Sequence, residues 1–177
     1  NNEQKRAHKL AMEEFMSVPL HQKEYQPFGD LYIEFQGHEG YTDYHRELDI
    51  ENALCKTSYM AGGVKYSREV VASFPHQLIA IQLTADRAKA LSFNIKLDAE
   101  HEEKELITRE NSQTLRVTVK DGILSGTARI VVVTDGILSS EEDRIVVSNA
   151  QSATLWLSAA TNFKNYKDLS NDPVATL

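Results

Sequence analysis

The chain has 177 residues and a formal net charge of −7, because 26 aspartates and glutamates outnumber 19 lysines and arginines. That length suits one domain with a sizeable core, and the interspersed charges exclude the basic stripe that nucleic acid or an anionic membrane would require as a partner. The single cysteine, Cys55, excludes an intrachain disulfide framework, and no apolar run reaches the length of a transmembrane helix.

A helix is expected first, over about residues 2–16. Ala7, Leu10 and Phe15 fall on one face of such a helix, opposite charged side chains. Pro19 ends the pattern, since proline cannot continue the hydrogen-bonded backbone of a helix. The apolar face predicts that this helix packs on the rest of the fold.

The stretch 25–35 is predicted to join the helix to the first strand. Pro27 fixes its own backbone angle, and Gly29 permits a sharp change of direction. From Asp30 to Phe35, polar and apolar residues then alternate with the two-residue period of a half-buried strand.

About ten strand-like runs separated by turn residues lie between about residues 30 and 160. They predict an all-β fold, an antiparallel β-sandwich with the N-terminal α-helix packed on it. The run 130–133 is apolar on both faces and predicts a strand inside a sheet. The pairs Asp121–Gly122 and Asp135–Gly136 each close a run and predict tight turns in which the glycine takes a positive φ.

We expect a single domain over residues 1–177, with a linker-like segment over about 161–177. The chain opens on Asn1 directly ahead of the helical pattern, with neither an initiating methionine nor a signal peptide. It is therefore expected to be a piece of a longer polypeptide.

The strongest candidate for a metal site is the group His38, Glu39, Asp43 and His45. Its spacing matches no known metal-binding motif, and an acidic turn beside a strand accounts for the same residues. The sequence holds no nucleophile motif and no phosphate-binding glycine loop, and no pair of carboxylates stands out. We therefore expect no catalytic residue, no metal and no cofactor in this chain.

The predicted loop Thr161–Asp168 mixes amides, aromatic rings and a carboxylate without any period. This composition suits either a solvent loop or a surface facing a saccharide, because rings stack on sugars and amides bind hydroxyl groups. One function is therefore a stand-alone carbohydrate-binding β-sandwich with Trp156, Phe163 and Tyr166 as stacking groups. Another is a purely structural sandwich in a cell-surface assembly.

Several separated stretches occur in a characteristic order and spacing: 25–31 (YQPFGDL), 44–49 (YHRELD), 59–69 (YMAGGVKYSRE) and 159–168 (AATNFKNYKD). In these the chain resembles the N-terminal domain of the family 95 glycoside hydrolases, the α-L-fucosidase family. The resemblance implies a β-sandwich of the super-sandwich type that packs against a following (α/α)6 helical barrel of the same polypeptide. It also implies that the barrel hydrolyses terminal α-L-fucosyl linkages with inversion, using a glutamic acid and a water activated by asparagine and aspartate.

No position of this chain matches those catalytic motifs, so the resemblance assigns it no catalytic residue. The implied partners are the helical catalytic domain and, through the full enzyme, a glycan substrate, with an extracytoplasmic location. Two stretches of the family domain, GNGRLG and NEDTLW, are missing ahead of the helix. Their absence predicts an exposed sheet edge and self-association of the fragment.

Ten residues are candidates for a substrate-side or domain-interface surface, on the expectation that the two loops carrying them lie on the same side of the sandwich. They are Tyr25, Gln26, Pro27, Phe28, Asp30, Thr161, Asn162, Phe163, Asn165 and Tyr166.

Overall fold

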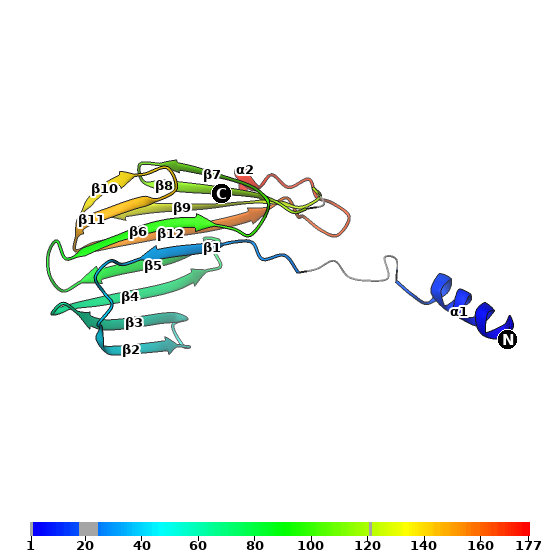
Figure 1. The fold of residues 1–177 in the computed structure, drawn as a ribbon, viewed down its shortest axis with the longest axis horizontal. Coiled ribbons are helices and arrows are strands. Elements are labelled where there is room, and N and C mark those ends of the chain that lie inside the picture. Colours follow the sequence, from blue (N-terminus) through cyan, green and yellow to red (C-terminus); the bar gives the residue numbers. More distant parts are fainter. Residues whose placement is uncertain (1, 18–24, 121) are drawn as a thin grey trace.

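The computed structural model of the protein describes residues 2–17, 25–120 and 122–177. Two antiparallel sheets pack face to face (Figure 1), which confirms the predicted all-β sandwich. The smaller sheet contains, in spatial order, β1 (Asp30–Glu34), β6 (Leu91–Asp98), β11 (Ile145–Ala150) and β10 (Ile137–Ser140). The larger sheet contains, in spatial order, β2 (Thr42–Asp49), β3 (Leu54–Ala61), β4 (Val64–Ser73), β5 (Leu78–Ala85), β12 (Ser152–Thr161), β9 (Ser125–Thr134), β8 (Ser112–Thr118) and β7 (Glu103–Arg109).

The core lies between the two sheets and follows from strand alternation. In β6, the alternate apolar side chains from Leu91 to Leu97 are buried, as the sequence predicts. The facing side chains of the larger sheet include Leu83, Ile130 and Leu155, none more than 2% exposed. The predicted interior strand containing residues 130–133 is β9, which lies between β12 and β8.

A buried amide, that of Gln113, ties the two sheets together. Gln113 is 0% exposed and lies on β8. Its Oε1 accepts a hydrogen bond from the backbone N–H of Leu97 at 2.9 Å, and its Nε2 donates to the carbonyl of Asp143 at 2.9 Å. Because an unsatisfied buried amide is costly, these bonds fix how β8 sits against β6.

The predicted helix forms as α1 (Asn2–Glu14), and its predicted end at Pro19 lies outside the described residues. The prediction that this helix packs on the sandwich is wrong, because the helix is exposed in the structure. Leu10 is 54% exposed and Phe15 83% exposed, and Figure 1 shows α1 apart from both sheets. The physical reason is a thin apolar stripe, in which alanines alternate with few large side chains, so docking would bury too little apolar area to offset the ordering cost.

The smaller sheet covers only part of the larger one. Strands β2, β3 and β4 extend beyond β1 (Figure 1). Every residue of β2 before Asp49 is exposed, whereas β8, β9 and β12 each carry fully buried side chains. The larger sheet is therefore open to solvent over β2 and only partly covered over β3, whose residues are half-buried or buried.

The segment after β12 folds back on the sandwich. Asp172 caps the short helix α2 (Pro173–Thr176) by accepting hydrogen bonds from the backbone N–H groups of Val174 and Ala175. This helix contacts β12 and β9. Neither described helix has the length and apolar character needed to cross a membrane.

Candidate functional site

The two loops predicted as one surface lie at the same end of the sandwich, where β9 begins and β12 ends. The ring of Phe28 lies directly against Gly126, which pairs with Thr161 across the two strands. Asn162 anchors the second loop, since its Oδ1 accepts from the Ser125 N–H at 3.0 Å. Figure 1 shows the chain entering β1 at this same end.

The two loops present three exposed aromatic side chains, and local contacts are found around Tyr166. Tyr25 is 91% exposed, Phe163 51% and Tyr166 83%. The Lys167 ammonium lies 5.2 Å from the centre of the Tyr166 ring, and the backbone around Asn165 closes a tight turn.

The remaining candidates lie along the entry to β1. The carbonyl of Pro27 accepts a hydrogen bond from His101 Nε2 at 2.8 Å. Asp30 begins β1 opposite Asp98, and Gln26 lines a hollow of about 260 Å³ with the acidic segment 100–103. None of the residues of the 161–166 loop lines that hollow.

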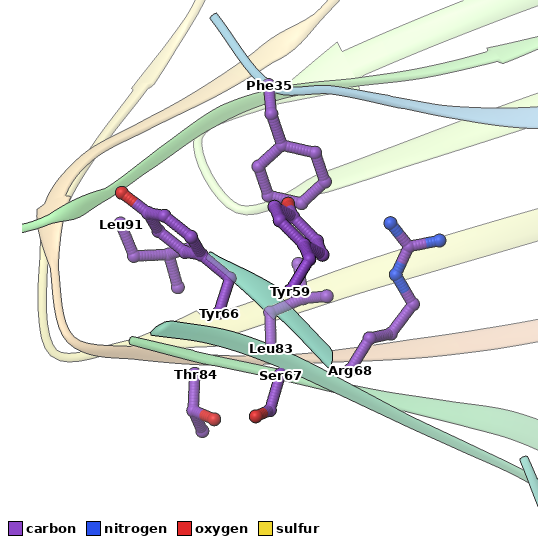
Figure 2. Close-up of a pocket in the computed structure, with 8 residues that line it drawn as sticks. All are labelled: Phe35, Tyr59, Tyr66, Ser67, Arg68, Leu83, Thr84 and Leu91. Atoms are coloured by element: carbon purple, nitrogen blue, oxygen red, sulfur yellow. The ribbon is translucent and has the colours of Figure 1, made fainter. Parts of the chain in front are cut away.

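A second candidate site lies at the other end of β1, on the partly covered side of the larger sheet. It is a hollow of about 360 Å³ lined by Phe35, His38, Glu39, Tyr41, Tyr44 and Tyr59, here called the aromatic hollow. Figure 2 shows the inner side of this region, where Phe35 points from the smaller sheet toward Tyr59 and Tyr66 on the larger one.

A β-bulge sets the outer rings of the aromatic hollow. Between the pairs Thr42↔Met60 and His45↔Ser58 the register shifts, so two residues of β2 stand opposite Tyr59 of β3. Asp43 occupies the bulge with φ 51°, a left-handed conformation that aspartate tolerates better than most residues.

The rings that meet at this bulge have exposed faces. The ring centres of Tyr41 and Tyr44 are 5.8 Å apart, and those of Tyr41 and Tyr59 are 5.9 Å apart. Tyr41 is 57% exposed and Tyr44 53% exposed. Ring faces that solvent reaches are available to a ligand.

His38 forms the inner wall of the aromatic hollow. Its ring stacks on Phe35 at 5.1 Å and lies 4.2 Å from Tyr66, and its Nδ1 is hydrogen-bonded to the Tyr59 hydroxyl at 2.8 Å. Burial lowers the pKa of His38, and Glu39 opposes this in part. Burial likewise raises the pKa of Tyr59 and of Tyr66, so this wall is uncharged at neutral pH.

A guanidinium group lies beneath these rings. The Cζ of Arg68 is 5.7 Å from the centre of the Phe35 ring, and Figure 2 shows its side chain beside Tyr59. The Arg68 Nε is buried and has no hydrogen-bond partner within the described part of the chain. Arg68 lines a small adjoining cavity together with Phe35 and Tyr59, so a positive charge and an unpaired donor lie next to two of the rings of the aromatic hollow.

The candidate metal ligands are not assembled into a site. His38 faces the aromatic rings, whereas His45 lies 3.5 Å from the Glu47 carboxylate on the exposed strand β2. Over residues 2–17, 25–120 and 122–177, no three histidine, cysteine, aspartate or glutamate side chains come together in a way that could hold a metal.

Sequence reasoning missed the aromatic hollow. Its tyrosines stand on two strands and in a turn, and strand pairing brings them together. The signal that could have revealed it is the clustering of tyrosines in the sequence, because four of the seven fall between positions 41 and 66. The site offers exposed ring faces, a carboxylate at the rim and hydrogen-bonding groups inside, a combination typical of small-molecule sites.

Comparison with known proteins identifies relatives of the chain. The sequence model of a family described as "Glycosyl hydrolase family 65, N-terminal domain" matches residues 1–166. "Alpha-L-fucosidase 2" from Arabidopsis thaliana is 42% identical over 96 residues, which make up 52% of this chain and 11% of that protein. A solved structure, "Putative kojibiose phosphorylase from human microbiome", aligns with a TM-score of 0.45 at 13% identity, covering 76% of this chain and 19% of that chain.

The family match over residues 1–166 confirms the predicted resemblance to the N-terminal domain of a glycoside hydrolase. The matching family is described as family 65, whereas the motifs of the sequence resemble family 95. The chain spans about a tenth of the length of the curated relative that it matches.

Proposed function

The chain belongs to the glycosyl hydrolase family 65 N-terminal domain family, and from that premise we propose that it is a non-catalytic domain supporting a catalytic (α/α)6 barrel of the same polypeptide. The barrel hydrolyses terminal α-L-fucosyl linkages in glycans. The observation that carries the proposal is the 42% identity over 96 residues with a protein named Alpha-L-fucosidase 2. The aligned part is 11% of that protein, which leaves ample length for a catalytic domain elsewhere in such a polypeptide.

The surface at the end of the sandwich supports a role in contacting another domain. The loops 25–30 and 161–166 lie together there and present Tyr25, Phe163 and Tyr166, each more than half exposed. Exposed aromatic side chains gathered on one surface are typical of interaction sites. We assign this end as the surface that faces the barrel.

The test is hydrolysis of 4-nitrophenyl α-L-fucopyranoside by the isolated chain and by the complete polypeptide from which it comes. We expect release of 4-nitrophenol by the complete polypeptide and none by the chain alone, since the chemistry belongs to the barrel. Turnover by the chain alone would refute the non-catalytic role. Absence of turnover in the complete polypeptide would refute the fucosidase assignment.

The isolated chain is also proposed to self-associate. β2 is an edge strand of the larger sheet, and it exposes Leu48 at 66% beside Tyr44 at 53%. An exposed edge with apolar side chains invites pairing with another chain. Light scattering over a wide concentration range should give a mass that rises above that of one chain, whereas a constant monomeric mass would contradict this.

We further propose an extracytoplasmic location for the complete polypeptide, on the ground that its proposed substrate is a glycan. Fractionation of the source cells followed by detection of the protein tests this. Recovery in the cytoplasmic fraction alone would refute it.

A further inference from the structure

We infer that the aromatic hollow binds one pyranose ring of a glycan, held against Tyr41 and Tyr44. This is a binding site distinct from the loops 25–30 and 161–166, and its assignment to L-fucose rests on the proposed function. The site lies over β2 and β3, at the opposite end of β1 from those loops.

The outer part of the aromatic hollow fits the apolar face of a sugar ring. Tyr41 and Tyr44 keep more than half of their surface exposed, and their rings meet at 5.8 Å with an angle of 53°. Two tilted rings form a corner against which the C–H groups of a pyranose can pack. The volume of about 360 Å³ lies in the range of small-molecule sites.

The rim and the inner wall supply the polar groups that a saccharide requires. Glu39 lines the hollow and can accept hydrogen bonds from sugar hydroxyls. The Tyr59 hydroxyl, bonded to His38 Nδ1 at 2.8 Å, keeps capacity for a further hydrogen bond. Polar groups that converge on one side of an apolar surface fix the orientation of a ligand.

The positive charge next to the aromatic hollow distinguishes between two kinds of ligand that aromatic sites accept. An aromatic cage can hold a quaternary ammonium group by cation–π attraction. Here Arg68 already places a cation 5.7 Å from the centre of the Phe35 ring, and its repulsion disfavours a second cation nearby. A neutral polyhydroxylated ring meets no such penalty.

The bulge in β2 is an independent indication that the aromatic hollow is a functional site. Bulges occur preferentially beside functional sites, where they redirect a side chain. Without the extra residue at the bulge, the position opposite Tyr59 would hold one side chain of β2 in place of two. The left-handed Asp43 backbone is the local conformational cost of this arrangement.

The test is titration of the whole chain with L-fucose, with D-glucose and tetramethylammonium chloride as comparison probes, followed by amide chemical shifts and calorimetry. We expect saturable L-fucose binding that shifts the amides of Glu39, Tyr41 and Tyr44. Tyr44→Ala should weaken binding by about threefold to tenfold, the size expected for one aromatic contact, whereas Tyr44→Phe should retain it.

The matched control is Tyr166→Ala, which removes another exposed tyrosine at the far end of the sandwich and should leave the affinity unchanged. Thermal unfolding of each variant establishes that it is folded, and Glu39→Gln tests the site without removing a ring. Loss of binding in Tyr166→Ala but not in Tyr44→Ala would overturn the inference. Binding of tetramethylammonium without binding of either sugar would also overturn it, and neither result would bear on turnover by the complete polypeptide.

Discussion

At the scale of single residues, Gly136 shows why one backbone position admits no side chain. The sequence predicts a tight turn with positive φ at the pair Asp135–Gly136. Gly122 of the similar pair has φ +70°, but the φ of Gly136 lies outside the left-handed region. A Cβ on Gly136 would instead lie 2.6 Å from the Ser148 carbonyl oxygen and 2.7 Å from the Ala150 Cβ. Close approach of β11 explains this glycine, and sequence alone could not reveal it.

The Gly136→Ala variant should therefore be destabilised. Because backbone atoms supply two of the three close contacts, the chain cannot move away cheaply, and we expect a loss of about 1–3 kcal/mol in the free energy of unfolding. Denaturant unfolding measures it. Gly40→Ala is the control, since nothing lies within 4 Å of its added Cβ. Equal stability of the two variants would contradict the packing described at Gly136.

We expect His38 to make the stability of the fold sensitive to acid. Burial lowers its pKa below the usual 6.5, so the unfolded chain takes up the proton first as the pH falls. The stability that neutral His38 contributes is present above pH 6.5 and declines as the pH falls through its lowered folded value.

We accordingly expect the melting temperature to fall between about pH 7.5 and about pH 5.5, and to fall less in His38→Asn than in the unsubstituted chain. His8→Asn, in the exposed helix α1, is the matched control, because it removes a histidine that lies outside both sheets. A pH dependence that is the same in His38→Asn as in the unsubstituted chain would rule out this residue as the cause.

At the scale of elements, alternation along a strand predicts which side chains carry stability. In β9, Ile130 is 0% exposed between the sheets, whereas Val133 is 58% exposed on the outward face. Ile130→Ala should cost about 2–5 kcal/mol, because it removes buried methyl groups and leaves a cavity. Val133→Ala on the same strand should cost far less, and denaturant unfolding of both variants gives the comparison. Similar losses would place the core elsewhere.

The helix α1 should contribute little to the stability of the sandwich. Leu10 and Phe15, the largest apolar side chains of its predicted packing face, are more than half exposed. Deletion of residues 1–16 should therefore leave the thermal unfolding midpoint of the sandwich unchanged. A clear decrease would show that the helix packs on a sheet in solution.

Local patterns explain how far these elements could be predicted. Apolar and polar residues alternate from Asp30 to Phe35 and from Leu91 to Leu97, and this pattern predicts β1 and β6. A two-residue period can be read from the sequence itself. Their pairing with each other joins distant parts of the chain, and no local pattern records it. The aromatic hollow was missed for the same reason, because it requires strand pairing and the bulge at Asp43.

At the scale of the whole molecule, the unequal sheets shape what the domain can do. Eight strands face four, so the larger sheet is open over β2 and partly covered over β3, where the aromatic hollow lies. The loops 25–30 and 161–166 gather at the opposite end, free to meet another domain. The proposed glycan site and the proposed docking surface therefore lie at opposite ends of one small sandwich.

The most direct test of the supporting role is removal of residues 1–177 from the complete polypeptide. Hydrolysis of 4-nitrophenyl α-L-fucopyranoside and the thermal unfolding midpoint are measured with and without this domain. We predict that the truncated polypeptide loses turnover and unfolds at a lower temperature, because the barrel loses the surface that supports it. Unchanged turnover together with an unchanged midpoint would contradict the account.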